Sequence, residues 1–296
     1  MIPISYTRKL KLPALLIFTF ACLLSASKPR PIVWTAIGDS ITYLNDHPEQ
    51  TGNRITKGYL TLISEKYPAI TYINKGYNGW SAVRIAQQID NLGLEKSDVY
   101  TIFLGTNDWW QGQPVGTFDD YLNNTGPNTI NGAFRVILDK LRSLSPKARI
   151  MLITPLQRGD FVYIANMKNN AYGSYRDKNG QKLSEVADLI ARIGRREKLP
   201  VVDLFYGSGI TPENMVHFKR LREPGGESYR NYSYPEYTSI AFDPEKDEYP
   251  YPPEAVFMTY DGLHPSDEGY RVIADMVLKK WKGRKKPSSS QPVSKP

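Results

Sequence analysis

The chain alternates short runs of β-branched, aliphatic and aromatic residues with segments of helical period. Four of five such runs are almost continuously apolar, as in strands covered on both faces. The predicted strands lie at residues 32–37, 69–73, 99–104, 148–153 and 201–204. Apolar residues recur every three or four positions in the predicted helices, at residues 57–66, 82–89, 133–144, 183–196 and 267–281. This alternation predicts an α/β fold with a parallel, doubly wound sheet.

In such a sheet the carboxyl ends of the strands meet at one edge, and ligands bind in the loops beyond it. Candidate functional residues should therefore follow strands directly. Two segments, 155–180 and 205–258, are too long for ordinary connections and are rich in Gly, Pro, Asn, Tyr and charged residues. We expect both to face the substrate.

A serine stands where the first strand ends, in Gly38-Asp39-Ser40. A hydroxyl is a weak nucleophile at its ordinary pKa and needs a neighbouring base, for which His264 is the candidate. Asp261, three residues upstream, can reach the other ring nitrogen, hold its tautomer and stabilise the imidazolium. The pattern predicts a catalytic triad of Ser40, His264 and Asp261, whereas Asp39 is better suited to holding the turn.

Acyl transfer also needs hydrogen-bond donors that are placed in advance for the oxyanion of the tetrahedral intermediate. Asn107 follows the third strand and offers a side-chain amide, while Gly79 follows the second and offers an unobstructed backbone N–H. The Ser40 N–H would be the third donor. In the loop after the second strand, Gly76 is an alternative to Gly79 as the donor of the backbone N–H to the oxyanion.

Several of these polar residues also have purely structural interpretations. Asn107 could form an Asx turn, and Asp261 could cap the last helix. Ser266 is the better cap because two acidic residues follow it, which leaves Asp261 free for the histidine. The other histidines, His47 and His217, stand in polar loops without a cluster of ligands, which favours surface positions over metal binding.

Taken in order, these segments resemble the four blocks of the SGNH (GDSL) hydrolase superfamily, which are named for Ser, Gly, Asn and His. The matching residues are Gly38-Asp39-Ser40, Gly79, Gly105-Thr106-Asn107-Asp108, and Asp261 with His264. The resemblance spans residues 37–264. It implies a flavodoxin-like three-layer α/β/α sandwich, a serine esterase working through an acyl-enzyme, and no metal or other cofactor.

The first 27 residues are typical of a signal peptide: basic residues precede an apolar run, and Ser25-Ala26-Ser27 suits cleavage. The run is short for a membrane span, so we expect export to the periplasm or outside the cell without stable membrane insertion. The single cysteine, Cys22, lies inside the run. A lipoprotein anchored through Cys22 is the alternative, although the residues before it form a poor lipobox.

The net charge of +8 is concentrated at the two ends of the chain. The leader carries three basic residues and residues 279–296 carry seven, so the body between them has a net charge of −2. A basic, Ser/Pro-rich end on a near-neutral domain is typical of a solvated tail rather than a nucleic-acid-binding surface. We therefore predict a hydrolase domain at 28–282, a disordered tail at 283–296 and no nucleic-acid partner.

Aromatic residues near the predicted site give an indication of the substrate class. Trp109 and Trp110 directly follow the third block, where they could contact a substrate, and a set of tyrosines could stack on sugars, line an acyl pocket or simply pack a long loop. These are Tyr206, Tyr229, Tyr232, Tyr234, Tyr237, Tyr249, Tyr251 and Tyr260. Export and these aromatics favour O-deacetylation of a polysaccharide or glycan.

Two alternatives stay open, a lysophospholipase or thioesterase that acts on lipids and a non-catalytic glycan-binding protein on an esterase scaffold.

Overall fold

The computed structural model describes residues 30–165 and 180–282. The predicted signal peptide with Cys22 and the predicted tail at 283–296 lie outside the described residues. Every element below belongs to one compact unit, which begins at Pro31.

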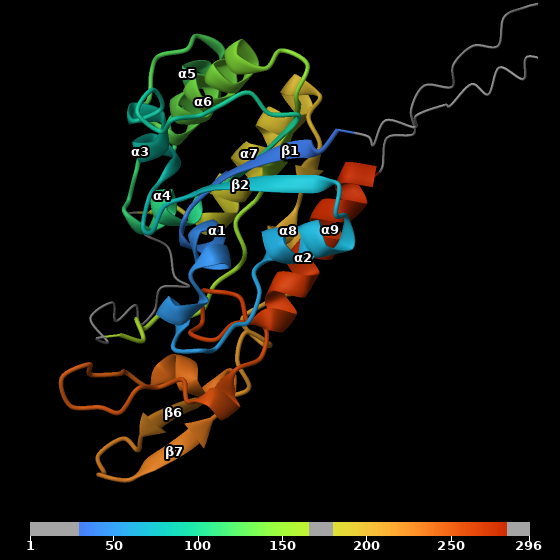
Figure 1. Cartoon of the computed structure of the whole chain (residues 1–296). Helices are drawn as coiled ribbons and strands as arrows, with labels where there is room; N and C mark the ends of the chain where they lie inside the picture. Colours follow the sequence, from blue (N-terminus) through green and yellow to red (C-terminus); the bar gives the residue numbers. More distant parts are fainter. Residues whose placement is uncertain (1–29, 166–179, 283–296) are drawn as a thin grey trace, which may run out of the picture. The chain divides into compact units, whose positions relative to one another are not determined.

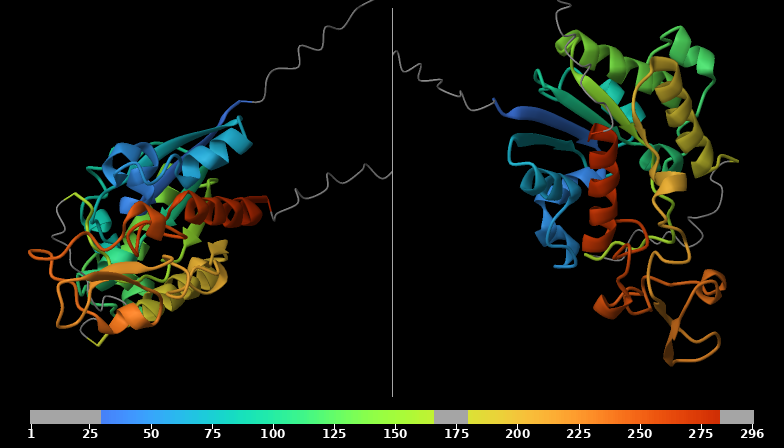
Figure 2. Two further views of the ribbon diagram at one scale, coloured as in Figure 1. Left: turned by 90° about the horizontal axis from the view of Figure 1, so that it is seen from below. Right: turned by 90° about the vertical axis from the view of Figure 1, so that its right-hand side faces the viewer.

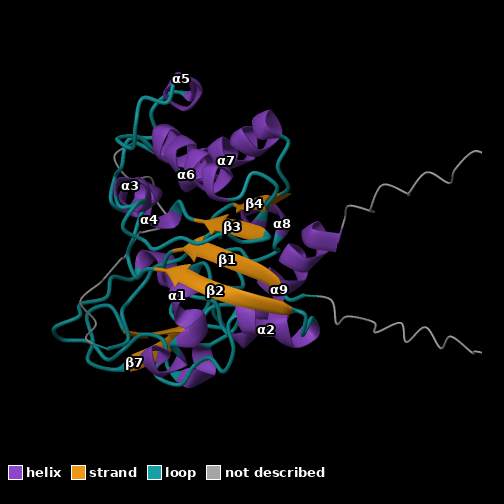
Figure 3. Ribbon diagram, turned by 45° about the horizontal axis from the view of Figure 1, so that its top comes forward, coloured by secondary structure: helices purple, strands orange, loops and turns teal. Residues whose placement is uncertain are grey.

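The centre of this unit is a five-stranded parallel sheet with the strand order β2-β1-β3-β4-β5, and Figure 3 labels the first four of these strands. This order is that of flavodoxin-like sheets. The strands are β1 (Ile32–Gly38), β2 (Ile70–Gly76), β3 (Val99–Phe103), β4 (Arg149–Ile153) and β5 (Val201–Val202). They agree with the predicted strands to within a few residues at each end, and the α/β fold class is confirmed.

Helices cover both faces of the sheet and give the three layers (Figure 1 and the right-hand view of Figure 2). One face carries α2 (Tyr59–Lys66) and α9 (Asp267–Lys282), and the other carries α3 (Ala82–Gln87), α6 (Ile130–Leu144) and α7 (Leu183–Glu197).

Alternate side chains of β4 point to opposite faces of the sheet and so pack against different helix layers. Met151 and Ile153 pack with α9, whereas Ile150 and Leu152 pack with α6 and α7. Such strands are apolar throughout because both faces are buried.

Local capping explains where several helices begin. The side chain of Ser81 accepts a hydrogen bond from the Arg84 N–H at the start of α3, and Thr129 does the same for the Gly132 N–H at the start of α6. Ser266 Oγ accepts from the Gly269 N–H at 3.3 Å before the final helix, so Asp261 is not used as its cap. No helix in residues 30–165 or 180–282 is long and apolar enough to cross a membrane.

The segment 205–258 contains regular structure that the sequence analysis missed. An antiparallel hairpin pairs β6 (Lys219–Arg222) with β7 (Tyr229–Tyr232), and the short helices η3 (Glu236–Ser239) and η4 (Pro253–Ala255) follow. The β6 sequence is mostly basic and lacks the apolar alternation by which half-buried strands are recognised.

The hairpin has its own apolar cluster, which includes Leu221, Tyr237 and Tyr251 and also Val162 from the first long segment. The two long segments therefore pack on each other.

The remaining short elements lie mostly in the strand-end loops. They are α1 (Ser40–Tyr43), η1 (Leu44–Asp46), η2 (Pro48–Thr51), α4 (Thr106–Trp110), α5 (Phe118–Leu122) and α8 (Leu204–Gly207).

Candidate active site

The site lies at the point where the strand order reverses, between β1 and β3. Gly38, the last residue of β1, pairs with Gly76 of β2 on one side and with Phe103 of β3 on the other. The chains leaving these three strand ends therefore start at one edge of the sheet, which is where ligands bind in open parallel sheets. Ser40 and Asn107 follow two of these strand ends within a few residues.

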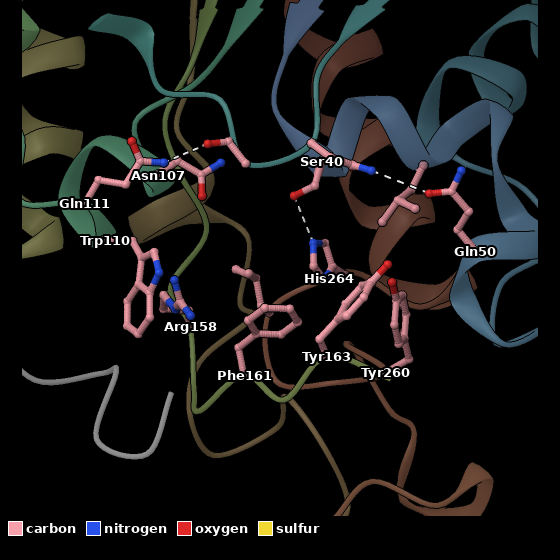
Figure 4. A pocket seen from close by; sticks show the side chains of 14 residues that line it. Ser40, Gln50, Asn107, Trp110, Gln111, Arg158, Phe161, Tyr163, Tyr260 and His264 are labelled. Atoms are coloured by element: carbon pink, nitrogen blue, oxygen red, sulfur yellow. Dashed lines mark hydrogen bonds between the residues drawn. The ribbon is translucent and has the colours of Figure 1, made fainter. Parts of the chain in front are cut away.

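Ser40, His264 and Asp261 form a continuous chain of hydrogen bonds (Figure 4 shows its first link). Ser40 Oγ lies 2.9 Å from His264 Nε2, and His264 Nδ1 lies 2.7 Å from Asp261 Oδ2. The other carboxylate oxygen of Asp261 accepts the N–H groups of Leu263 and His264 at 3.0 and 2.7 Å. Since Asp261 is 1% exposed, its orientation is set by these three contacts.

The loop that carries the histidine is closed on itself. Thr259 pairs with Pro265 as an isolated β-bridge, and the Tyr260 N–H donates to the His264 carbonyl at 3.0 Å. Gly262 has φ +84°, a left-handed conformation that favours glycine, and a Cβ there would stand 1.9 Å from the Asp160 carbonyl oxygen. The tight turn thus depends on Gly262 for backbone conformation and for close packing.

Aromatic rings enclose the His264 imidazole. The Phe161 ring meets it edge-on at 5.1 Å between centroids, and the Tyr260 ring stacks on it at 5.7 Å. His264 is 5% exposed as a result. The ring is held where its Nε2 faces Ser40.

The turn before the serine is held by Asp39. Its carboxylate accepts the Ile41 N–H at 3.0 Å and caps the first turn of α1, in agreement with the turn-holding role predicted for it. Burial raises the pKa of Asp39 to about 6. Ser40 is the first residue of α1, so its backbone N–H is among those that a helix leaves without an internal partner.

The candidate oxyanion donors border the same cavity. Asn107 Nδ2 donates one hydrogen to the Trp80 carbonyl at 3.1 Å, which orients the amide and leaves its second N–H for a ligand. Gln111 Nε2 donates to the Gly79 carbonyl at 2.7 Å and holds that peptide, whose φ is +72°. The competing Gly76 uses its N–H to bond the Asn74 side chain at 2.9 Å, which favours Gly79 as the donor.

Asp108 ties these two loops together. Its carboxylate accepts the N–H groups of Ala82 and Val83 at 2.7 and 3.1 Å, and so connects α4, which carries Asn107, with the start of α3 just after Gly79. Asp108 is fully buried, and this burial raises its pKa to about 6.

A cavity of about 380 Å³ opens beside Ser40 (Figure 4). Its lining combines side-chain amides, aromatic rings and one guanidinium. The lining residues are Ser40, Leu44, Gln50, Asn78, Gly79, Asn107, Trp110, Gln111, Arg158, Phe161, Tyr163, Tyr260, Leu263 and His264.

The two tryptophans proposed as substrate contacts differ. Trp110 lines the cavity, whereas Trp109 is 1% exposed, packs in the core and donates its indole N–H to the Gln181 carbonyl at 2.9 Å. We correct the prediction for Trp109 accordingly, since adjacent residues of a helix point in different directions. Among the eight tyrosines only Tyr260 lines this cavity, and Tyr237 and Tyr251 pack the hairpin instead.

Several lining residues were missed by sequence reasoning. Gln111 comes one turn after Asn107, so helical spacing could have identified it. Arg158 and Phe161 lie in the loop after β4, which the strand-end rule marks as substrate-facing without indicating which side chains turn inward. The same rule marks Asn78, which directly precedes Gly79 in the loop after β2, whereas Gln50 carries no signal in the sequence.

An α/β/α sandwich with a serine, a histidine and a carboxylate linked at the switch point of its sheet has the architecture of an ester hydrolase. The chain belongs to the GDSL-like lipase/acylhydrolase family, whose model matches residues 36–272. It is thus an enzyme that hydrolyses ester bonds.

Solved structures agree with this assignment. A possible lipase from Chitinophaga pinensis is 56% identical, with a TM-score of 0.83, and the alignment covers 85% of this chain and 99% of that one. A lipase/acylhydrolase from Enterococcus faecalis, 18% identical over 88% of this chain and 100% of that one, shares the fold at a TM-score of 0.51. A Lactobacillus plantarum protein also shares the fold, at a TM-score of 0.57 and with 20% identity over 85% of this chain and 97% of that one. No curated protein matches the chain.

Proposed function

We propose that Ser40 is the nucleophile of this esterase and His264 its general base. His264 Nε2 takes the hydroxyl proton as Ser40 Oγ attacks the ester carbonyl, and the imidazolium returns the proton to the leaving alcohol. Water then attacks the resulting acyl-serine with the same histidine as base. The 2.9 Å contact between Oγ and Nε2 supports this role, and Asp261 stabilises the imidazolium through Nδ1.

The oxyanion would be held by the N–H groups of Ser40 and Gly79 and by the side-chain amide of Asn107. All three residues line the cavity beside the serine hydroxyl. Such donors contribute most when fixed before the reaction. The hydrogen bonds of Asn107 to Trp80 and of Gln111 to Gly79 supply this rigidity.

The substrate class that fits best is an O-acetylated glycan. The observation that carries this proposal is the composition of the cavity wall, where Gln50, Asn78 and Gln111 stand with Trp110 and Tyr260. Amides can bond sugar hydroxyls while aromatic faces pack against the apolar faces of sugar rings. Gln111 and Gln50 each donate to a protein group, at 2.7 and 3.0 Å, and a lipid acyl chain would cover their remaining polar atoms without bonding them. The signal-peptide pattern of residues 1–27 supports export to where such glycans occur.

The test is acetate release from a panel of acetylated polysaccharides, with p-nitrophenyl acetate and p-nitrophenyl octanoate as small substrates. We expect turnover of the acetyl esters, weak turnover of octanoyl, and loss of both in Ser40→Ala. Preference for octanoyl would support the lipid alternative. Equal rates for the parent protein and Ser40→Ala would support the non-catalytic glycan-binding alternative.

A further inference from the structure

Arg158 carries a buried charge inside the active-site cavity. The residue is 3% exposed, and the cavity that it lines is the one that contains Ser40 and His264. Burying a guanidinium is costly unless it is hydrogen-bonded or paired with an anion.

Within the described residues, two of the three guanidinium nitrogens lack the hydrogen bonds that usually offset such burial. The guanidinium atoms without a hydrogen-bond partner in this part of the chain are Nε and Nη2. Its contacts are cation–π contacts, at 4.9 Å from the Trp110 ring centroid and 5.5 Å from that of Trp109. Figure 4 shows Arg158 beside Trp110. The two indoles hold the guanidinium in place and leave N–H groups for a ligand.

Two carboxylates that act electrostatically on Arg158 are already committed to other groups. Asp261 bonds His264 and two backbone N–H groups, and Asp160 forms a buried ion pair with Lys219. Both exert an electrostatic influence on Arg158, but neither forms a salt bridge or a hydrogen bond with it. Burial lowers the pKa of Arg158 only to about 10, so the side chain stays charged at neutral pH.

We propose that Arg158 binds a carboxylate of the substrate, so that the enzyme prefers acetylated acidic sugars, such as uronic acids, over neutral ones. The inference rests on the proposed glycan esterase function and specifies its substrate class. A carboxylate in the cavity would bond the guanidinium through charge-assisted hydrogen bonds, which are shorter and stronger than neutral ones. Arginine suits this task better than lysine because its planar fork both stacks on indole and bonds two oxygens.

The first experiment compares kcat/KM for acetylated methyl galacturonide and acetylated methyl galactoside. We expect the acidic substrate to be favoured about 10- to 100-fold, as for a charged hydrogen bond. Arg158→Gln should abolish most of this ratio, and Arg158→Lys should restore it only in part. The matched control is Arg192→Gln, which removes an exposed cation–π contact 3.9 Å from the Phe118 ring and should leave the ratio as it was.

The second experiment needs no variant and no glycan turnover. Galacturonate, galactose and inorganic phosphate are tested as inhibitors of p-nitrophenyl acetate hydrolysis by the unmodified protein. We expect galacturonate to inhibit at least tenfold more tightly than galactose. Equal inhibition by the two sugars overturns the role of Arg158, and inhibition by phosphate without inhibition by galacturonate overturns the carboxylate assignment.

Failure of the two proposals can be told apart. If no acetylated glycan is hydrolysed but galacturonate inhibits, the glycan esterase proposal is wrong and Arg158 is an anion-binding residue. If neutral and acidic glycans are deacetylated equally well, the glycan proposal stands and the inference about Arg158 is wrong.

Discussion

Lys219 of β6 forms a buried ion pair with Asp160, a residue of the loop after β4 that also carries Arg158 and Phe161. The Lys219 and Asp160 side chains are 5% and 4% exposed. Tyr251 adds a hydrogen bond from its hydroxyl to the Asp160 carbonyl. The hairpin of the second long segment thus anchors a wall of the cavity from outside.

Lys219→Met should destabilise the protein, because it removes the cation from a buried ion pair. Removing one partner of a buried pair costs about 3–5 kcal/mol. Urea denaturation would measure this loss in the free energy of unfolding. Arg220→Met is the control, since it breaks an exposed 3.2 Å pair with Glu248 and should cost less than about 1 kcal/mol. Similar losses in the two variants would contradict the role given to the buried pair.

Asp261→Asn should lower kcat by about 10⁴, the size of the effect in a serine-protease triad, with little change in KM. The amide can present an N–H to His264 Nδ1 and favour the tautomer that cannot accept the serine proton. Steady-state assays with p-nitrophenyl acetate would measure kcat and KM. Asp275→Asn, which alters an exposed pair with Lys66, is the control and should retain activity. A loss of kcat below tenfold in Asp261→Asn would rule out the triad.

Gly79→Ala should reduce kcat about 10- to 100-fold, because an L-residue disfavours φ +72° and the peptide that offers the donor N–H would rotate. The expected loss of activity does not come from steric crowding, since a Cβ at this position meets no atom within 4 Å. Gly209→Ala is a matched control with the same φ and the same open space. Both variants should lose similar thermal stability, whereas only Gly79→Ala should lose turnover. Full activity in Gly79→Ala would remove this residue from the proposed oxyanion hole.

Asp108 should make the stability of the fold depend on pH. Its pKa is raised from 3.8 to about 6 by burial, so the folded protein binds this proton more tightly than the unfolded chain does. Raising the pH from about 4 to above 6 therefore lowers the free energy of unfolding. The expected loss is about 3 kcal/mol, because each unit of difference in pKa between the folded and unfolded protein corresponds to about 1.4 kcal/mol.

Urea denaturation at pH 4.5 and pH 7 would measure this dependence in the parent protein and in Asp108→Asn. The variant should lose less stability over this interval than the parent does. The exposed Asp119→Asn serves as the control and should follow the parent. An unchanged pH dependence in Asp108→Asn would show that the carboxyl does not titrate in this range.

Local patterns in the sequence determined the fold class and the candidate catalytic residues. Strands such as 148–153 are recognisable because burial on both faces requires a continuous apolar run. Ser40 and Asn107 could be located because parallel strands bring their carboxyl ends to one edge, so position relative to a strand implies position in space.

The roles of the charged and aromatic residues depend on packing between segments that are far apart in the sequence. Lys219 and Arg158 look like ordinary solvated charges in the sequence, yet both are buried, because their surroundings come from distant segments. Trp109 and Trp110 are neighbours in the sequence, but one packs in the core and the other faces the cavity. Burial is a property of packed neighbours, and these are set by long-range contacts that no local pattern records.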